Sequence, residues 1–235
     1  MKLYVYCLSD DLSAGAVEGV SGIGGARVGL YCCGAIKAVI SEAGGERALL
    51  TRENVLAHDG VIRHALRETT PLPFRFGTIV TASELESYVE ARRSSIESLL
   101  DRVRGAVEMG VKIIWDKEAA RSAAEAQPCD EADGAGPGRA FLLAKRREME
   151  AAEEIEKRAK DIAGWMENRL NSLVRETFVS IRPADALVIV AAHLVERSRI
   201  EQYRARLKSM RQERSDLRFL TSGAWPPYSF AHIRA

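Results

Sequence analysis

Long apolar runs, an excess of charge of one sign and clustered cysteines are all missing from this 235-residue chain. No stretch reaches the roughly 20 apolar residues of a membrane-spanning helix, so we expect no lipid-membrane segment. Lys and Arg number 34 against 33 Asp and Glu, a formal net charge of +1. A dedicated nucleic-acid binder normally shows a large basic excess, so nucleic acid is not an expected partner. The four cysteines form no CxxC pair and are interpreted as reduced side chains of a cytoplasmic protein.

Motifs for catalysis, cofactors or metals are equally scarce. Residues 22–24 begin like a dinucleotide-binding fingerprint, but Arg27 stands where the third glycine belongs, and a strand follows instead of a helix. The four histidines are scattered, and no two have the i, i+4 spacing of a zinc-binding helix. No GxSxG nucleophile motif occurs. We therefore predict no catalytic residues, no cofactor and no metal site.

The composition instead indicates a folded chain with a sizeable core. The hydrophobic fraction is 46%, far more than an intrinsically disordered chain contains, beside a charged fraction of 29%. Runs rich in β-branched and aromatic residues predict strands at 3–8, 28–33 and 36–41, the last two as a hairpin. Apolar residues at helical spacing predict a helix within 51–70, and alternation over 74–80 predicts another strand.

The remainder of the first half adds a second helix and a strand. Ser83, with Glu86 three positions later, predicts a capping box at the start of a helix that continues to Val103. A further strand is expected at 111–115. Strands and helices mixed in this order suit a small sheet covered by helices on one face. We predict an α+β fold with two small domains, of which the N-terminal one, residues 1–108, is ferredoxin-like.

The second half is dominated by one long amphipathic pattern. After a linker at 119–138 that is poor in large hydrophobic residues, apolar residues advance in steps of three and four from about 139 to 178. This predicts a helix on the order of 60 Å long. Such a helix is too long for one small domain to cover. It either kinks near Gly164 or turns part of its apolar stripe towards another chain.

Three further elements complete the predicted C-terminal α+β domain, residues 109–235. They are a buried strand at 186–195, a basic helix from Ser198 and a last strand at 217–221, followed by an aromatic and proline-rich tail at 223–235. Acidic residues interleave with the basic residues of the helix, so it is interpreted as a solvated face. Docking on an acidic partner is the alternative.

Two short segments have an unusual composition. Residues 71–78 read PLPFRFGT, where alternation puts Phe74 and Phe76 on one face and Arg75 on the other. The segment is either an ordinary core strand or one that offers Arg75 to a carboxylate of the chain or of a partner. Residues 225–230 read WPPYSF, a stiff segment with a large aromatic area. It packs either on its own domain or in a groove.

In these segments the chain resembles the gas vesicle protein F/L family. The matching features are PLPFRFGT at 71–78 after a helix, GRAFL at 138–142 opening the long helix, and GAWPPYSF at 223–230. The family more often has Gly-Pro-Trp where this chain has Gly-Ala-Trp. The order of elements is also similar over essentially the whole chain. These motifs do not separate the F branch from the L branch.

The resemblance implies a non-enzymatic accessory or minor structural protein of gas vesicle assembly, located in the cytoplasm or with the vesicle. The partners it implies are the small hydrophobic shell protein and other gas vesicle accessory proteins. The residues whose loss we expect to impair folding or binding are Arg75, Phe76, Arg139, Trp225 and Tyr228. The alternative is a regulator or enzyme that binds a small molecule on a ferredoxin-like scaffold.

Overall fold

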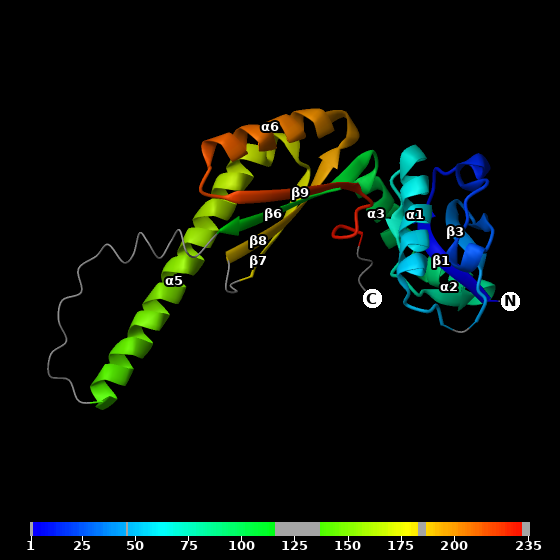
Figure 1. Ribbon diagram of the computed structural model, residues 1–235. Coiled ribbons are helices and arrows are strands. Elements are labelled where there is room, and N and C mark those ends of the chain that lie inside the picture. The colour runs from blue at the N-terminus through cyan, green and yellow to red at the C-terminus, as the bar shows by residue number, and fades with distance from the viewer. Residues whose placement is uncertain (1, 46, 116–136, 183–186, 232–235) are drawn as a thin grey trace. The chain divides into compact units, whose positions relative to one another are not determined.

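The computed structural model describes residues 2–45, 47–115, 137–182 and 187–231 (Figure 1). Contacts within the chain divide it into two compact units. The first contains Met1–Met109, Leu194–Arg197 and Gly223–Ala235, and the second contains Gly110–His193 and Ser198–Ser222. The tail at 223–235, which we expected in the C-terminal domain, thus groups with the first unit.

The first unit is built on a five-stranded sheet with β1 at its centre. Its strands are β1 (Lys2–Ser9), β2 (Val28–Cys33), β3 (Ile36–Glu42), β4 (Leu72–Pro73) and β5 (Ile79–Thr81). They follow the order β2-β3-β1-β4, with β5 also paired to β1, and the recorded pairings are antiparallel. Every residue of β1 from Leu3 to Ser9 is buried, as its apolar sequence requires. The predicted hairpin of β2 and β3 is confirmed.

The strand predicted at 74–80 is wrong over most of its length. The chain leaves the sheet after β4, turns at residues 75–78 and returns in β5. Gly77 has a φ of +86°, a left-handed conformation that favours glycine. The Thr78 backbone N–H and its hydroxyl both donate to the Arg75 carbonyl, at 3.3 and 2.7 Å. These bonds close the turn and interrupt the alternation that the sequence suggested.

The helices of this unit are α1 (Arg52–Glu68), α2 (Ala82–Ala91) and α3 (Arg93–Val103). The capping box of α2 uses Thr81 and Glu84, so the prediction of Ser83 and Glu86 was wrong by two residues. Glu84 N donates to Thr81 Oγ1 at 3.2 Å, and Thr81 N donates to Glu84 Oε2 at 2.7 Å. The single helix predicted through Val103 is broken at Arg92, where φ is −122° and ψ is 15°.

The second unit has the element order and strand order of a ferredoxin-like fold. Its elements are β6 (Ala106–Trp115), α5 (Pro137–Leu170), β7 (Glu176–Arg182), β8 (Leu187–Glu196), α6 (Ile200–Glu213) and β9 (Arg218–Trp225). The sheet order is β7-β8-β6-β9. α5 continues through Gly164 without a break and ends at Leu170. The predicted helix end near 178 was therefore wrong, because residues 176–182 form β7.

The α+β class with two small α+β units is confirmed. The first unit shares the strand order of the second, with its β2-β3 hairpin beside the central first strand. Two short 3₁₀ turns, η1 (Ala14–Val17) and η2 (Ile23–Gly25), stand where the ferredoxin-like fold has its first helix. Residues 194–197 group with the first unit, and within that unit the Arg197 guanidinium donates to the carbonyls of Leu66 and Thr69 at the end of α1, at 2.6 and 2.8 Å.

A buried pair of polar side chains lies in the core of the second unit. His193 on β8 and Tyr203 on α6 are both fully buried, and His193 Nδ1 lies 2.7 Å from the Tyr203 hydroxyl. His193 Nε2 has no hydrogen-bond partner among the described residues. Burial lowers the pKa of His193 to about 4, so the imidazole is neutral at pH 7.

This pKa predicts a loss of stability in acid. The unfolded imidazole takes up a proton near pH 6.5 and the folded one only near pH 4, so the free energy of unfolding should fall as the pH drops between these values. The full contribution is about 3 kcal/mol. Urea unfolding at pH 7.5, 5.5 and 4.5 measures it. Carboxylates also titrate in this pH range, so the control is the double variant His193→Phe/Tyr203→Phe, which lacks the buried imidazole. This variant should lose less stability than the unmodified chain as the pH falls. Equal losses would contradict the prediction.

Candidate partner-binding surface

The C-terminal segment 223–231 packs within the first unit, on Glu108 in the part of β6 that groups with that unit. The Glu108 carboxylate accepts two hydrogen bonds from Ser229, from its backbone N at 2.7 Å and its hydroxyl at 2.8 Å. Pro226, Pro227 and Phe230 are buried. Gly223 has a φ of +117°, and a Cβ there would lie 2.8 Å from the Glu108 carbonyl oxygen. The segment therefore needs glycine at its start and a carboxylate beneath its end.

Trp225 and Tyr228 are held beside α1 by this packing. The Arg63 guanidinium carbon lies 3.9 Å from the centroid of the Trp225 ring, a cation–π contact, while Arg63 Nε donates to Asp59 at 2.6 Å. Tyr228 is partly exposed, and burial of its hydroxyl end together with the nearby Asp59 carboxylate raises the pKa of the phenol. We call Leu56, Asp59 and Arg63 of α1, with Trp225 and Tyr228, the α1 face.

One end of the α1 face is strongly apolar. The exposed fractions of Leu49 and Leu50 are 73% and 80%, and Val55 and Leu56 in the first turns of α1 are also exposed. The Leu49 carbonyl accepts from Thr51 N and from the Asn54 side-chain amide, both at 2.9 Å, which fixes this stretch to the helix start. We call these four residues the leucine end. Large exposed apolar side chains that gather in one place are typical of binding surfaces.

A groove adjoins the leucine end. It measures about 380 Å³ and its apolar lining includes Tyr4, Ile23, Ala48, Leu49 and Ile79. The sequence pattern included Val55 and Leu56 only in the apolar spacing of the helix predicted within 51–70, where both prove exposed, and it did not single out Leu49 or Leu50. The available signal was two adjacent leucines immediately before Thr51, which fit neither the strand alternation nor the helical spacing around them.

The two adjacent motif residues differ in burial, since Phe76 is half-buried and Arg75 is exposed. The Phe76 ring packs edge-on against Tyr4 and His58, with ring centroids 6.3 and 5.7 Å apart. The Tyr4 hydroxyl lies 3.0 Å from His58 Nδ1 and accepts from Gly77 N at 2.9 Å. Arg75 is exposed. Phe76 therefore belongs to an aromatic cluster under the turn, while the Arg75 side chain faces solvent.

Arg75 lies on the rim of a small groove. The groove measures about 240 Å³, and its lining includes Leu8, Leu72, Phe74 and Tyr88 beside Ala231 of the C-terminal segment. The fifth residue of our prediction, Arg139, lies in α5, but its side chain is outside the described residues. The structure thus brings Trp225 and Tyr228 together and leaves Arg75 and Phe76 in a separate place.

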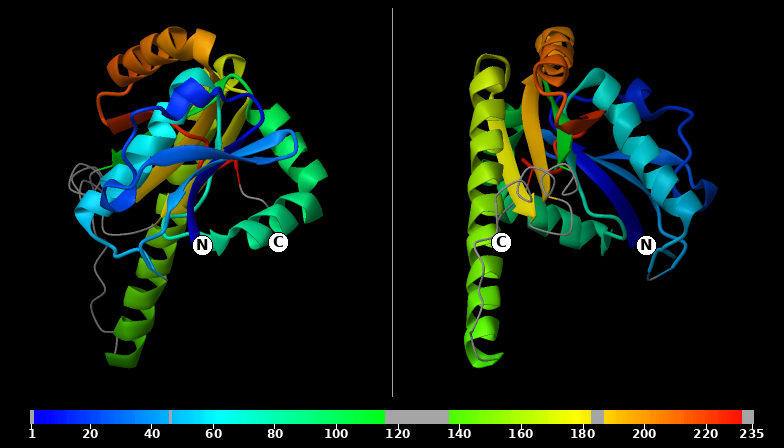
Figure 2. Two further views of the ribbon diagram at one scale, coloured as in Figure 1. Left: turned by 90° about the vertical axis from the view of Figure 1, so that its right-hand side faces the viewer. Right: turned by 60° about the vertical axis from the view of Figure 1, so that its left-hand side comes forward.

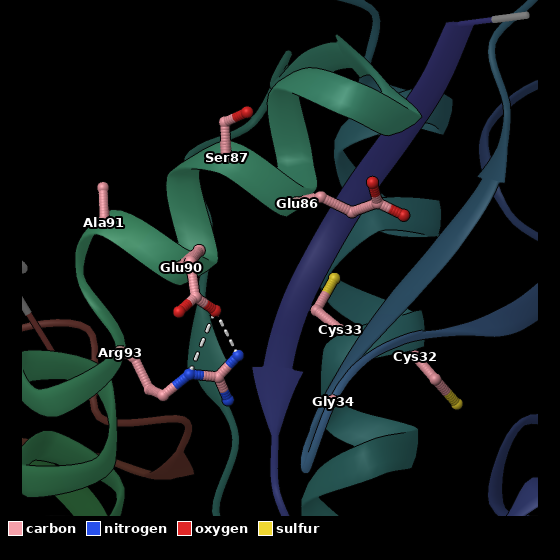
Figure 3. Close-up of a pocket in the computed structure, with 8 residues that line it drawn as sticks. All are labelled: Cys32, Cys33, Gly34, Glu86, Ser87, Glu90, Ala91 and Arg93. Atoms are coloured by element: carbon pink, nitrogen blue, oxygen red, sulfur yellow. Dashed lines mark hydrogen bonds and ion pairs between the residues drawn. The ribbon is translucent and has the colours of Figure 1, made fainter.

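A larger pocket lies between the β2–β3 turn and α2 (Figure 3). It measures about 610 Å³ and contains Cys33, Glu86, Glu90 and Arg93 in its lining. Glu90 and Arg93 pair with each other, and Glu86 accepts a hydrogen bond from Tyr31. Burial raises the pKa of the Cys33 thiol, which makes it a poorer nucleophile, and Cys32 points away from the pocket. Glu90 and Arg93 are thus paired within the pocket, Glu86 is paired with Tyr31 outside its lining, and no hydrogen bond among the described residues joins the Cys33 thiol to a base.

The part of the chain that the structure describes contains neither a metal-binding cluster nor a membrane-spanning helix. No group of three or more His, Cys, Asp or Glu side chains could hold a metal ion there. No described helix combines the length and apolarity needed to span a bilayer.

The family model "Gas vesicle synthesis protein GvpL/GvpF" matches residues 2–232. The chain belongs to this family. It is 26% identical to gas vesicle protein F1 of Halobacterium salinarum over 99% of this chain and 93% of that protein. It is 30% identical to gas vesicle protein L of a Streptomyces species, over 98% of this chain and 92% of that protein. The resemblance drawn from the motifs is confirmed, and the family implies a role in gas vesicle formation.

Two crystal structures of family members share the fold. Gas vesicle protein GvpF from Anabaena sp. PCC7120 has a TM-score of 0.83 at 22% identity, covering 100% of this chain and 97% of that one. GvpF from Microcystis aeruginosa has a TM-score of 0.81 at 21% identity, covering 99% of both chains. The two-unit α+β architecture is therefore the architecture of GvpF.

We predict that Glu108 anchors the C-terminal segment. Glu108→Ala removes both hydrogen bonds to Ser229, whereas Ser229→Ala removes only the one from the hydroxyl, so the first variant should lose more stability. A hydrogen bond to a charged group contributes roughly 1.5–3 kcal/mol. Urea unfolding measures both losses, with Glu97→Ala, an exposed carboxylate on α3, as the control. A Glu108→Ala variant as stable as this control would contradict the anchoring role.

The structure predicts that Phe76 contributes to stability and Arg75 does not. Phe76→Ala should lower the free energy of unfolding by about 2 kcal/mol, less than a fully buried Phe would cost, because its ring is half-buried. Arg75→Ala should change it by less than about 0.5 kcal/mol, as exposed side chains do. Thermal or urea unfolding of the two variants measures the difference. Equal losses would show that Arg75 acts through folding.

Proposed function

We propose that this chain is a non-enzymatic accessory protein of gas vesicle formation that binds an apolar segment of another gas vesicle protein. The hydrophobic shell protein is the expected partner. The single observation that carries the proposal is the leucine end, four large apolar side chains that the first unit holds in solvent beside the α1 face. Binding there would cover apolar surface of the partner before or during its assembly.

The composition of the α1 face suits such a role. Tryptophan and tyrosine are frequent anchors of protein interfaces because they combine a large apolar area with a polar tip. Trp225 is fixed by Arg63, so little side-chain freedom is lost when a partner packs on it. The Asp59–Arg63 ion pair supplies a polar rim next to the apolar side chains.

The absence of a nucleophile–base pair in the pocket of Figure 3 supports a binding role over a catalytic one. Glu90 and Arg93 of that pocket pair with each other, and burial raises the pKa of the Cys33 thiol. The small-molecule alternative makes a different prediction, namely a melting temperature that rises by several degrees with a metabolite.

A pull-down with purified shell protein tests the proposal. The unmodified chain should retain shell protein, and Leu49→Ser/Leu50→Ser/Leu56→Ser should retain at least tenfold less, because three apolar contacts are lost. The matched control is Phe178→Ser/Leu220→Ser, which removes exposed apolar side chains from the second unit and should bind like the unmodified chain. Unchanged melting temperatures exclude unfolding as the cause.

Two outcomes would overturn the proposal. One is retention by the unmodified chain no greater than by an unrelated α+β protein. The other is equal retention by the leucine-end variant and the unmodified chain, which would place the interaction elsewhere.

A further inference from the structure

The small groove beside Arg75 has an apolar floor and aromatic walls. Leu8 of β1 and Leu72 of β4 are buried and form the floor, while Phe74 and Tyr88 are half-buried and form the walls. The Phe74 and Tyr88 ring centroids lie 5.8 Å apart. α2, which carries Tyr88, lies beside β1 in Figures 1 and 2. We call this feature the Arg75 groove.

The backbone on one side of the Arg75 groove is fixed to the sheet. Phe74 N donates to the carbonyl of Tyr6 in β1 at 2.8 Å. At the next residue the chain enters the turn that the two hydrogen bonds from Thr78 to the Arg75 carbonyl close. The Arg75 guanidinium therefore extends from a fixed backbone, and only side-chain freedom is lost when a ligand binds it.

Three donor groups at the Arg75 groove have no hydrogen-bond acceptor among the described residues. The Arg75 side chain makes no hydrogen bond or ion pair there, and the Tyr88 hydroxyl makes no hydrogen bond. The Arg92 guanidinium carbon lies 4.8 Å from the centroid of the Tyr88 ring, and this guanidinium pairs with no described carboxylate. None of the described residues that line the groove is acidic. The groove thus combines an apolar interior with unneutralised positive charge at its rim.

This combination favours a carboxylate that is joined to an apolar side chain. A guanidinium binds a carboxylate through two parallel N–H donors, and a phenol donates one further hydrogen bond. An inorganic phosphate would also bind the guanidinium, but it gains nothing from the apolar floor. The groove volume of about 240 Å³ is below the roughly 300–1,000 Å³ of small-molecule pockets. It therefore suits one side chain of a peptide better than a metabolite.

We propose that the Arg75 groove binds a segment of a partner protein in which a leucine-sized apolar side chain is next to an Asp or Glu. The apolar side chain fills the groove, and the carboxylate accepts hydrogen bonds from Arg75 and from the Tyr88 hydroxyl. Arg92 adds positive charge beside Tyr88. The groove holds a single side chain, so we expect a dissociation constant of roughly 0.1 mM for an isolated peptide. It shares no residue with the leucine end or the α1 face, so its test is independent of the proposed function.

Fluorescence anisotropy with labelled peptides tests the proposal. The peptide GSGELEGSG should bind the unmodified chain. GSGKLKGSG, which lacks the carboxylates, and GSGESEGSG, which lacks the apolar side chain, should each bind at least tenfold more weakly. Failure of GSGELEGSG to bind at about 1 mM protein, or equal binding of the three peptides, would overturn the proposal.

Variants distinguish the groove from general charge attraction. Arg75→Ala should weaken the binding of GSGELEGSG at least tenfold, and Tyr88→Phe, which keeps the ring, should weaken it about two- to tenfold. The matched control is Arg67→Ala, which removes an exposed arginine of α1 outside the groove and should bind like the unmodified chain. Equal affinities of Arg75→Ala and Arg67→Ala would overturn the proposal.

Charge reversal gives a readout that unfolding cannot imitate. Arg75→Glu/Arg92→Glu should bind GSGKLKGSG more tightly than GSGELEGSG, the opposite of the unmodified chain. An unchanged preference would mean that other cations attract the peptide, which contradicts the assignment of Arg75.

A chain that ends at Ala231 tests a different occupant, because Ala231 lines the Arg75 groove. GSGELEGSG should bind this shortened chain as tightly as it binds the unmodified one. Binding only after removal of residues 232–235 would show that the chain's own end fills the groove, and the proposal of a partner segment would then be wrong.

Discussion

The two hydrogen bonds that the Glu108 carboxylate accepts from Ser229 decide where the end of the chain lies. These residues are 121 positions apart, so only the completed fold brings them together. With them in place, Trp225 stacks on Arg63 and Tyr228 lies near Asp59. The α1 face therefore combines a helix from the first third of the chain with a segment from its end. Neither segment alone provides the complete face.

Local sequence patterns were sufficient where neighbouring residues decide the structure. Strands β1 to β3 followed from runs rich in β-branched and aromatic residues, and α5 followed from its continuous apolar stripe. These patterns failed where a distant contact or a single backbone angle determines the local structure. Alternation over 74–80 was real, but Gly77 and Thr78 close a turn within it. Thr81 and Ser83 both have Glu three positions later, and the end of β5 selects Thr81 as the cap.

The motif residues predicted from the family resemblance serve different purposes in the structure. Phe76 packs with Tyr4 and His58, which explains an aromatic at this position by folding alone. Trp225 is partly exposed and Arg75 is exposed, so both side chains can be reached by a partner. Glu108 could not be found from the sequence, because a single acidic residue in a strand looks like any solvent-facing residue. Only the position of Ser229 shows what it does.

A two-layer unit covers a helix only along the length of its strands, so any excess must face solvent or another molecule. In this chain the excess of α5 carries Phe141, Leu142 and Met149, which gain nothing from solvent. The leucine end of the first unit also exposes large apolar side chains. They lie at the start of a helix and not along its length. A short apolar segment of a partner would fit a cluster of this shape.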